Sequence, residues 1–230
     1  MTIQEMKTEF LIDYDRRSSL SASPVQDAEI SKFLNDGQES LINEWYSVYD
    51  KGEIVSKHLS ELIRFASINI FTVGNHPNSF FVELPDRFWR SLKEEVSINY
   101  TDSCGNVITG KRIPVVPMDR DYYNKYINNY YKKPNENRIW RFDHHRTNTT
   151  QNVVWGGTNF KRHELITFAG STITNYMIEY FKYPALMDIT NNVDCELDPA
   201  VQKEIIHRAV TKALEVVADS RLQTQVQVEP

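Results

Sequence analysis

The chain has 230 residues, of which 40% are hydrophobic and 25% are charged, the composition of an ordinary globular protein. Its longest apolar runs reach only a few residues, whereas a membrane-spanning helix needs roughly 20, so we expect no membrane association. The first residues lack a basic stretch followed by an apolar run, and we expect no signal peptide. Cys104 and Cys195 are too few for a disulfide framework, which indicates a soluble chain made in a reducing cytoplasm.

The net charge of −5 is unevenly distributed along the chain. Residues 1–50 carry a net −6, residues 51–109 carry −1, residues 110–165 carry +6 and residues 166–230 carry −4. A basic middle between acidic ends can steer a protein toward an anionic partner, or toward copies of itself. Chance clustering on solvated faces gives the same pattern, so charge alone leaves both interpretations open.

Apolar residues recur at helical spacing near the N-terminus. Met6 and Phe10 mark a first helix, and a second is predicted over residues 26–46 and a third over residues 55–65. Short helices joined in succession pack against one another to bury their apolar faces. The pattern therefore predicts a helical hairpin or small bundle over residues 1–66.

Residues 67–197 predict a β-rich region with short helices. Alternating polar and apolar residues indicate strands, and the Gly and Asn of residues 102–106 suit a hairpin turn. Pro85 fits the first turn of a short helix. The predicted strands are 67–73, 96–100, 107–113, 138–142, 163–168 and 174–183, and the predicted short helices are 84–89 and 119–131. We expect a mostly antiparallel sheet.

The last predicted helix covers residues 198–221. Asp198 is a good N-cap and Pro199 fits the first helical position, and apolar residues follow at i, i+4 and i+7. In residues 222–230, apolar or Thr positions alternate with Gln and Glu, which predicts an extended, strand-like tail. Such a tail can add to the edge of another subunit's sheet, or be a frayed polar end. The overall class is α+β, with helices at both ends.

Histidines are the first candidates for chemistry. Asp143, His144 and His145, with Asn159 and His163 downstream, resemble an HNH nuclease, in which one His activates water and later groups help to place a metal ion. That site needs a ββα frame, whereas Asn159 and His163 lie only four residues apart and His163 opens a predicted strand. A polar loop explains the pattern better, so the nuclease is the less favoured alternative.

Other catalytic and cofactor motifs are missing from the sequence. No GxSxG or GxGxxG occurs, and Gly156-Gly157-Thr158 lacks the Lys and the spacing of a P-loop. Neither Cys104 nor Cys195 has a close His partner, which argues against a zinc site. The sequence therefore predicts a protein that is not an enzyme and has no cofactor or metal.

Tyrosines and cations interleave over residues 120–141. Such residues can stack bases and neutralise phosphates, or form a protein interface, where Tyr and Arg are enriched. We favour the interface because no nucleic-acid-binding motif accompanies the stripe, and a nucleic-acid-binding protein is the alternative. The candidate interface residues are Tyr122, Tyr126, Tyr130, Lys132, Lys133, Arg138 and Arg141 in the stripe, His207 and Arg208 in the last helix, and Leu222, Thr224, Val226 and Val228 in the tail.

Several segments between residues 112 and 219 carry a family resemblance. The most specific is Cys195-Glu-Leu-Asp-Pro199 followed by Glu204-Ile-Ile-His-Arg-Ala-Val-Thr-Lys-Ala-Leu. The others are Arg112-Ile-Pro-Val-Val-Pro-Met-Asp-Arg-Asp-Tyr-Tyr-Asn-Lys-Tyr, Lys132-Lys-Pro, Arg138-Ile-Trp-Arg-Phe and Asn175-Tyr-Met-Ile-Glu-Tyr-Phe-Lys-Tyr-Pro184. Together they resemble the head-to-tail connector ring (adaptor) proteins of crAss-like and related short-tailed bacteriophages. Residues 1–66 contribute nothing to the resemblance.

The resemblance implies a virion structural protein at the capsid–tail junction, made in the cytoplasm of the host bacterium. Such proteins assemble as a closed ring, commonly twelvefold, under the portal, and the genome passes through the lumen. The implied partners are copies of the chain, the portal and other connector or tail proteins, with non-specific contact to passing DNA. Because tight phosphate contacts would stall sliding DNA, we predict that the basic region 110–165 faces an acidic neighbour.

Overall fold

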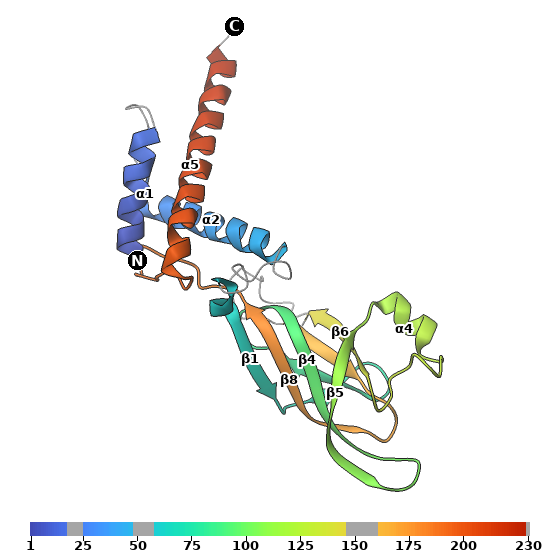
Figure 1. The fold of residues 1–230 in the computed structure, drawn as a ribbon. Helices are drawn as coiled ribbons and strands as arrows, with labels where there is room; N and C mark the ends of the chain where they lie inside the picture. Colours follow the sequence, from blue (N-terminus) through green and yellow to red (C-terminus); the bar gives the residue numbers. More distant parts are fainter. Residues whose placement is uncertain (18–24, 48–57, 146–160, 229–230) are drawn as a thin grey trace. The chain divides into compact units, whose positions relative to one another are not determined.

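The computed structural model describes residues 1–17, 25–47, 58–145 and 161–228 (Figure 1). They form two compact units: a helical unit from residues 1–62 and 184–230, and a sheet unit from residues 63–183. The sheet unit is thus inserted between two parts of the helical unit. Helices at both ends and a central sheet confirm the predicted α+β class.

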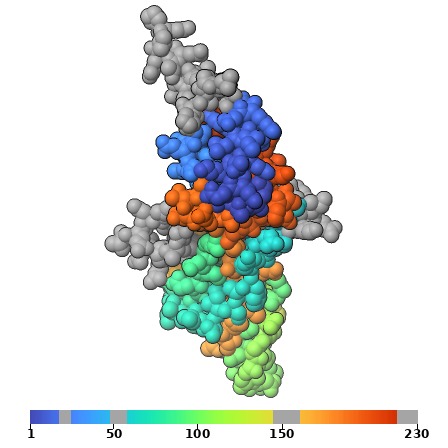
Figure 2. All heavy atoms as spheres, turned by 90° about the vertical axis from the view of Figure 1, so that its left-hand side faces the viewer, coloured from blue at the N-terminus to red at the C-terminus, as the bar shows by residue number. Residues whose placement is uncertain are grey.

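The helical unit contains α1 (Ile3–Arg17), α2 (Asp27–Ser47), the 3-10 turn η2 (Ser60–Leu62) and α5 (Pro199–Val228). Each helix packs against the others with the apolar side that its periodicity predicts. Figure 2 shows α1, in dark blue, with one side uncovered. The buried side chains are Ile3, Met6, Phe10 and Tyr14 of α1, Ile30, Leu34, Leu41 and Ile42 of α2, and Val201, Ile205, Ile206, Ala209, Val210 and Ala213 of α5.

Gly37 of α2 allows a close approach to α5. A Cβ atom at this position would lie 2.8 Å from the Ile205 carbonyl oxygen and 3.2 Å from the Ala209 amide nitrogen. Both are backbone atoms, so the helices would have to separate. The apolar periodicity predicted a helical bundle at the N-terminus, but nothing in the pattern indicated this contact with the C-terminal helix.

Gly37→Ala is therefore expected to destabilise the protein, although Ala is the better helix former by about 1 kcal/mol. Overpacking costs about 1–3 kcal/mol, and we expect the net free energy of unfolding to fall by about 1 kcal/mol. Chemical denaturation measures the change. Asn43→Ala, at an exposed position of the same helix, is the control and should leave stability within about 0.5 kcal/mol. A stabilised Gly37→Ala variant would contradict the tight α2–α5 contact.

Helix α5 begins as predicted but ends later. The Asp198 carboxylate accepts a hydrogen bond from the Ala200 amide at 2.8 Å, and Pro199 opens the helix. The tail predicted to be extended over 222–230 is helical from 222 to 228. Adding residues to an existing helix avoids the cost of nucleation, and Gln and Leu are good helix formers. Alternation over so few positions also satisfies i, i+4 spacing, which explains the error.

The sheet unit contains one eight-stranded sheet in the order β1-β8-β4-β5-β6-β7-β3-β2. All neighbours are antiparallel except β5 and β6, which are parallel, so the predicted mostly antiparallel sheet is confirmed. The strands are β1 (Ile63–Ile68), β2 (Thr72–Val73), β3 (Ser79–Glu83), β4 (Phe88–Thr101), β5 (Val107–Pro117), β6 (Ile139–His145), β7 (Lys161–Ile166) and β8 (Thr172–Lys182). Helix α4 (Arg120–Tyr126) lies in the β5–β6 connection.

The sheet is curled around an apolar core. Side chains of β3, near one end of the strand order, and of β8, near the other end, share one buried cluster. Twist and curl let a single sheet cover its own inner face. The cluster includes Val82, Val96, Ile98, Ile113, Ile139, Leu165, Tyr176 and Ile178. On the other face of β6 and β7, Trp140, Phe142 and Ile166 pack with Met118, Tyr123, Tyr126 and Ile127 of the α4 region.

The helix predicted over 84–89 was wrong, and the helix predicted over 55–65 is shorter than expected. Residues 84–87 form a turn that leads into β4, since the Phe88 amide donates to the Pro85 carbonyl at 3.1 Å and Arg87 has φ 59°. Proline suits a turn as well as a first helical turn. In the helix predicted over 55–65, only 58–62 are helical among the described residues. Pairing of β1 with β8 from Ile63 onward overrides the local preference.

Candidate functional site

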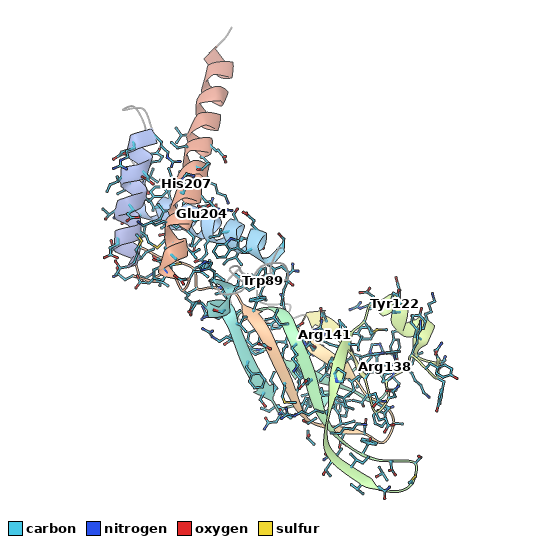
Figure 3. All side chains as sticks on the ribbon, viewed as in Figure 1. Trp89, Tyr122, Arg138, Arg141, Glu204 and His207 are labelled. Atoms are coloured by element: carbon cyan, nitrogen blue, oxygen red, sulfur yellow. The ribbon has the colours of Figure 1, made fainter. Side chains whose placement is uncertain are left out.

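The region after β5 presents a surface of tyrosines and lysines, here called the α4 patch. It consists of Tyr122, Lys125, Tyr126, Tyr130, Tyr131, Lys132 and Lys133. Tyr122 is 50% exposed, Tyr130 75% and Tyr131 82%, and Figure 3 shows Tyr122 on α4 at the outside of the sheet unit. Exposed aromatic residues gathered in this way are typical of surfaces that contact a partner.

Lysines of the α4 patch are held against its tyrosine rings. The Lys132 Nζ atom lies 4.0 Å from the Tyr126 ring centroid, and the Lys133 Nζ atom lies 5.4 Å from that of Tyr130. A hydrogen bond from Lys132 and the charge of Lys125 lower the pKa of Tyr126. Within the described parts of the chain, Lys125, Lys132 and Lys133 form no ion pair. The patch therefore presents cations that are ordered by contact with aromatic rings.

A second set of contacts anchors the patch to the sheet. The Tyr123 ring packs on Trp140 and Phe142 at centroid distances of 6.2 and 5.6 Å. Beside it, a cavity of about 410 Å³ is lined by Asn75, His76, Arg120, Tyr123, Asn124, Phe142 and His144. Helix α4 thus contributes residues both to the patch and to the lining of this cavity.

A buried carboxylate holds two of the residues that line this cavity, His76 and His144. Glu164 of β7 is fully buried, and its Oε1 atom accepts hydrogen bonds from the Asn75 amide at 2.6 Å, the His76 amide at 2.9 Å and the Ser79 hydroxyl at 2.6 Å. The His76 and His144 rings lie 3.0 and 2.8 Å from its two oxygens. Burial raises the pKa of Glu164, but the Ser79 and His76 hydrogen bonds outweigh it and lower the pKa to about 2.

Arg141 departs from its predicted place in the surface stripe. Its side chain is only 9% exposed and is paired with Glu94, which is 6% exposed. The Ser91 hydroxyl accepts a hydrogen bond from Arg141 at 3.0 Å, and the Tyr176 hydroxyl donates to Glu94 at 2.8 Å. Residues of β6 alternate between the two faces of the sheet, and position 141 faces inward, which the composition of the stripe did not reveal.

His163 extends this buried polar chain. Its Nδ1 atom lies 2.8 Å from the Tyr176 hydroxyl oxygen, and its Nε2 atom lies 3.4 Å from Asp143. Burial lowers the pKa of His163 well below its usual value, helped by Arg141 and Lys161, so the ring is neutral. Burial also raises the pKa of Tyr176, with Glu94 adding to the effect. Glu94, Glu164 and Tyr176 were not among the predicted site residues. The available signal for Glu164 was its position as a charged residue inside the predicted strand 163–168.

The nuclease hypothesis requires His144 and His163 to converge on one ion. In the register of β6 and β7, Asp143 is opposite His163, and His144 is opposite Arg162. Side chains alternate between faces along a strand, so His144 and His163 lie on opposite faces. Asn159 falls outside the described residues, as does the side chain of His145. Across the residues that the structure describes, no three His, Cys, Asp or Glu side chains are grouped to hold a metal ion.

The other candidate residues lie in both units. Arg138 is half-buried at the start of β6 (Figure 3). In the helical unit, the Nδ1 atom of His207 lies 2.9 Å from Arg17, and Arg208 pairs with Glu44 at 2.7 Å and with Glu204 at 2.9 Å. These two therefore contact neighbouring helices of their own unit. The backbone of residues 222–228 is helical, and their side chains are outside the description.

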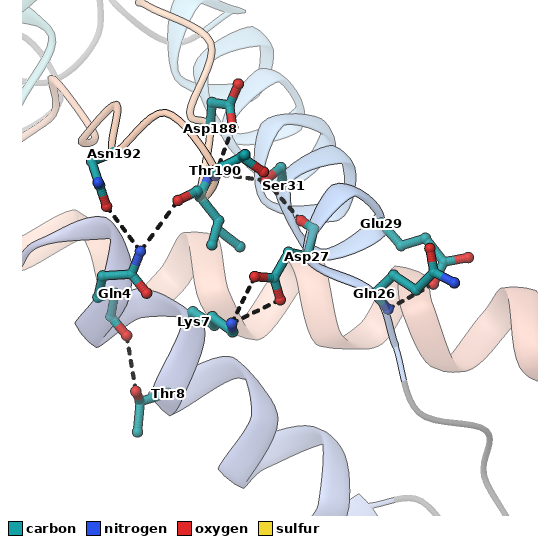
Figure 4. Close-up of polar contacts among 11 residues, drawn as sticks. Gln4, Lys7, Thr8, Gln26, Asp27, Glu29, Ser31, Asp188, Thr190 and Asn192 are labelled. Atoms are coloured by element: carbon teal, nitrogen blue, oxygen red, sulfur yellow. Dashed lines mark hydrogen bonds and ion pairs between the residues drawn. The ribbon is translucent and has the colours of Figure 1, made fainter.

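Polar contacts fix α1 and α2 to the segment that precedes α5 (Figure 4). The Lys7 Nζ atom lies 2.7 Å from Asp27, and the Gln4 amide donates to Asn192 at 2.9 Å. The Ile189 amide donates to the Ser31 hydroxyl at 3.1 Å. Chain ends far apart in sequence are thus bound together. In the described residues, no helix has the length and apolar character needed to cross a membrane.

Comparison with known proteins identifies the class. A family model of phage tail ring protein 3/4 matches residues 1–225, and the chain belongs to this family of phage structural proteins. It is similar to ring protein 4/5 of Bacteroides phage crAss001, with 25% identity over 93% of this chain and 92% of the relative. It is also similar to ring protein 3 of the same phage, with 24% identity over 83% of this chain and 85% of the relative. The resemblance to crAss-like phage ring proteins is confirmed.

Proposed function

We propose that the protein is a non-enzymatic subunit of a closed connector ring between portal and tail, through which the phage genome passes. The observation that carries this proposal is the family match over residues 1–225, which extends across both units. The ring belongs to the capsid–tail junction of the virion and is assembled from chains made in the host cytoplasm. Its neighbours are the portal and other ring or tail proteins.

Charge segregation supports head-to-tail assembly. In the described residues with placed side chains, the helical unit carries 7 Lys/Arg against 16 Asp/Glu, and the sheet unit carries 15 against 11. A ring needs a heterologous interface, in which one surface of each copy meets a different surface of the next. Opposite charges on the two units favour that arrangement over symmetric pairing. They also agree with a basic region that faces an acidic neighbour rather than the lumen.

The mass of the purified protein in solution tests the proposal. We expect a ring-sized species, and twelve copies of the 26.9 kDa chain would weigh about 320 kDa. The measurement is made on the full chain and on a chain truncated after Arg221, each alone and mixed with phage portal. Loss of portal binding on truncation would assign docking to residues 222–230. A chain that stays monomeric in every mixture would contradict the ring.

Nucleic-acid binding is the second candidate function, because the α4 patch combines exposed rings with cations. Such surfaces stack bases and neutralise phosphates with a strong dependence on salt. If this were its role, the monomer would bind DNA, and Lys132→Ala/Lys133→Ala would abolish the binding. Under the ring proposal, the parent chain and the Lys132→Ala/Lys133→Ala variant should both show only weak, sequence-independent binding to DNA.

A further inference from the structure

One side of α1 presents acidic side chains around an exposed apolar residue. Glu5, Glu9, Ile12 and Asp15, here called the α1 face, follow one another at spacings of four, three and three residues, so they share a side of the helix. Ile12 is 46% exposed, Glu5 and Asp15 are exposed and Glu9 is half-buried. The buried residues of α1, Ile3, Met6, Phe10 and Tyr14, lie on the opposite side of the helix.

Two of the three cations of α1, Lys7 and Arg17, contact other helices of the unit. Lys7 pairs with Asp27 at 2.7 Å, Arg16 lies 3.8 Å from Asp13, and Arg17 contacts His207 at 2.9 Å. Arg16 follows Ile12 by four residues, so it lies on the same side of α1, where its side chain is 75% exposed. The three carboxylates Glu5, Glu9 and Asp15 outnumber this one cation, so the face keeps a net negative charge beside an exposed hydrophobic side chain.

The α4 patch has the complementary composition. Its lysines form no ion pair among the described residues, and its tyrosines are the most exposed aromatic rings in the stripe. Lysine ammonium groups match carboxylates at the rim of an interface, where charge steers approach. Tyrosine rings match an exposed aliphatic side chain, because they supply apolar contact area at a small entropic cost. Each feature of one surface thus has a counterpart on the other.

We propose that the α4 patch of one copy binds the α1 face of a second copy. This contact rests on the ring assembly proposed above and names the surfaces that close it. Both surfaces occur once in every chain, so each copy offers a patch to one neighbour and a face to the other, which is the condition for head-to-tail closure. DNA would use the cations but would leave the α1 face without a role.

Charge-reversal variants of the full chain test the contact. Lys132→Glu/Lys133→Glu makes the patch acidic, and Glu9→Lys/Asp15→Lys makes the face basic. Each variant alone is expected to lose the ring-sized species, because like charges then meet. In an equimolar mixture, every contact of an alternating ring again joins opposite charges, and assembly is expected to return. The four-site variant should assemble alone.

Control measurements separate folding from contact. Arg64→Glu/Lys93→Glu reverses two cations on β1 and β4 and should leave the ring intact. Helix α4 packs on β6 and β7, and neither β1 nor β4 is adjacent to these two strands in the sheet. Circular dichroism and thermal melting of all variants should match the parent chain.

The outcomes are distinguishable. A parent chain that never forms a ring contradicts the proposed function and the contact together. A parent ring that both charge-reversal variants also form overturns the contact alone. Assembly of the four-site variant without recovery in the mixture would place the pairing within one chain and overturn the contact between copies. Intact rings that have lost DNA binding would assign the patch to nucleic acid.

Discussion

Arg141→Met is expected to lower the free energy of unfolding by about 3–5 kcal/mol, since breaking a buried ion pair leaves an uncompensated charge. The Glu94 carboxylate would remain buried, with the Tyr176 hydroxyl as its remaining neutral donor. Methionine fills a similar volume, so the loss of charge dominates the effect. Urea denaturation followed by circular dichroism measures the change.

Two control variants make this result specific. Glu94→Gln/Arg141→Met removes both charges while keeping an acceptor for Tyr176, and should recover a large part of the loss. Lys93→Met breaks an ion pair with Glu95 in which the Lys93 side chain is 67% exposed, and should cost less than about 1 kcal/mol. If the Arg141 and Lys93 substitutions cost the same, the buried pair has no special role.

Glu164→Gln is expected to cost about 3 kcal/mol at neutral pH, the free energy that corresponds to lowering a carboxyl pKa from 4.5 to about 2. The amide retains a carbonyl oxygen for some donors but loses the charge that draws Asn75, His76 and Ser79 together. The segment that joins β2 to β3 would lose its main polar support. Denaturation at pH 7 measures the difference from the parent chain.

The pH dependence of stability shows whether Glu164→Gln destabilises the protein by removing the charge or by disturbing the packing. Glu164 has a folded pKa below its unfolded value, so its contribution is complete above about pH 4.5 and disappears as the pH falls toward 2. The parent chain should therefore lose stability over this range more steeply than Glu164→Gln. Parallel pH profiles for the two proteins would show that the carboxylate charge contributes nothing.

Periodicity predicted the elements whose neighbours are close in sequence. Spacing of Met6, Phe10 and Tyr14 indicated α1, and the Gly and Asn of 102–106 indicated the hairpin that joins β4 and β5, whose register pairs Thr101 with Val107. Pro85 was misinterpreted because proline suits a turn and a first helical turn equally well. When a local sequence is compatible with both a turn and a helix, strand pairing with distant residues decides between them. The local sequence alone does not contain that information.

Burial of polar residues was the harder part to predict. Arg141 was grouped with surface cations because its neighbours in sequence are basic, but its partner Glu94 comes from β4, 47 residues earlier. Glu164 similarly gathers donors from residues 75–79. Only the strand order brings these groups together, and one sequence does not specify that order. The residues of the α4 patch are close in sequence, so grouping them required no knowledge of the strand order.

The insertion of the sheet unit into the helical unit has an evolutionary consequence. The chain enters the sheet unit at Ile63 and leaves it after β8, and Ile63 is paired directly with Phe181. Entry and exit therefore lie side by side, and the whole sheet unit behaves as a cassette between two adjacent junctions. An insertion, deletion or exchange confined to the sheet unit would leave the contacts among α1, α2 and α5 intact, so the two units can change in sequence independently.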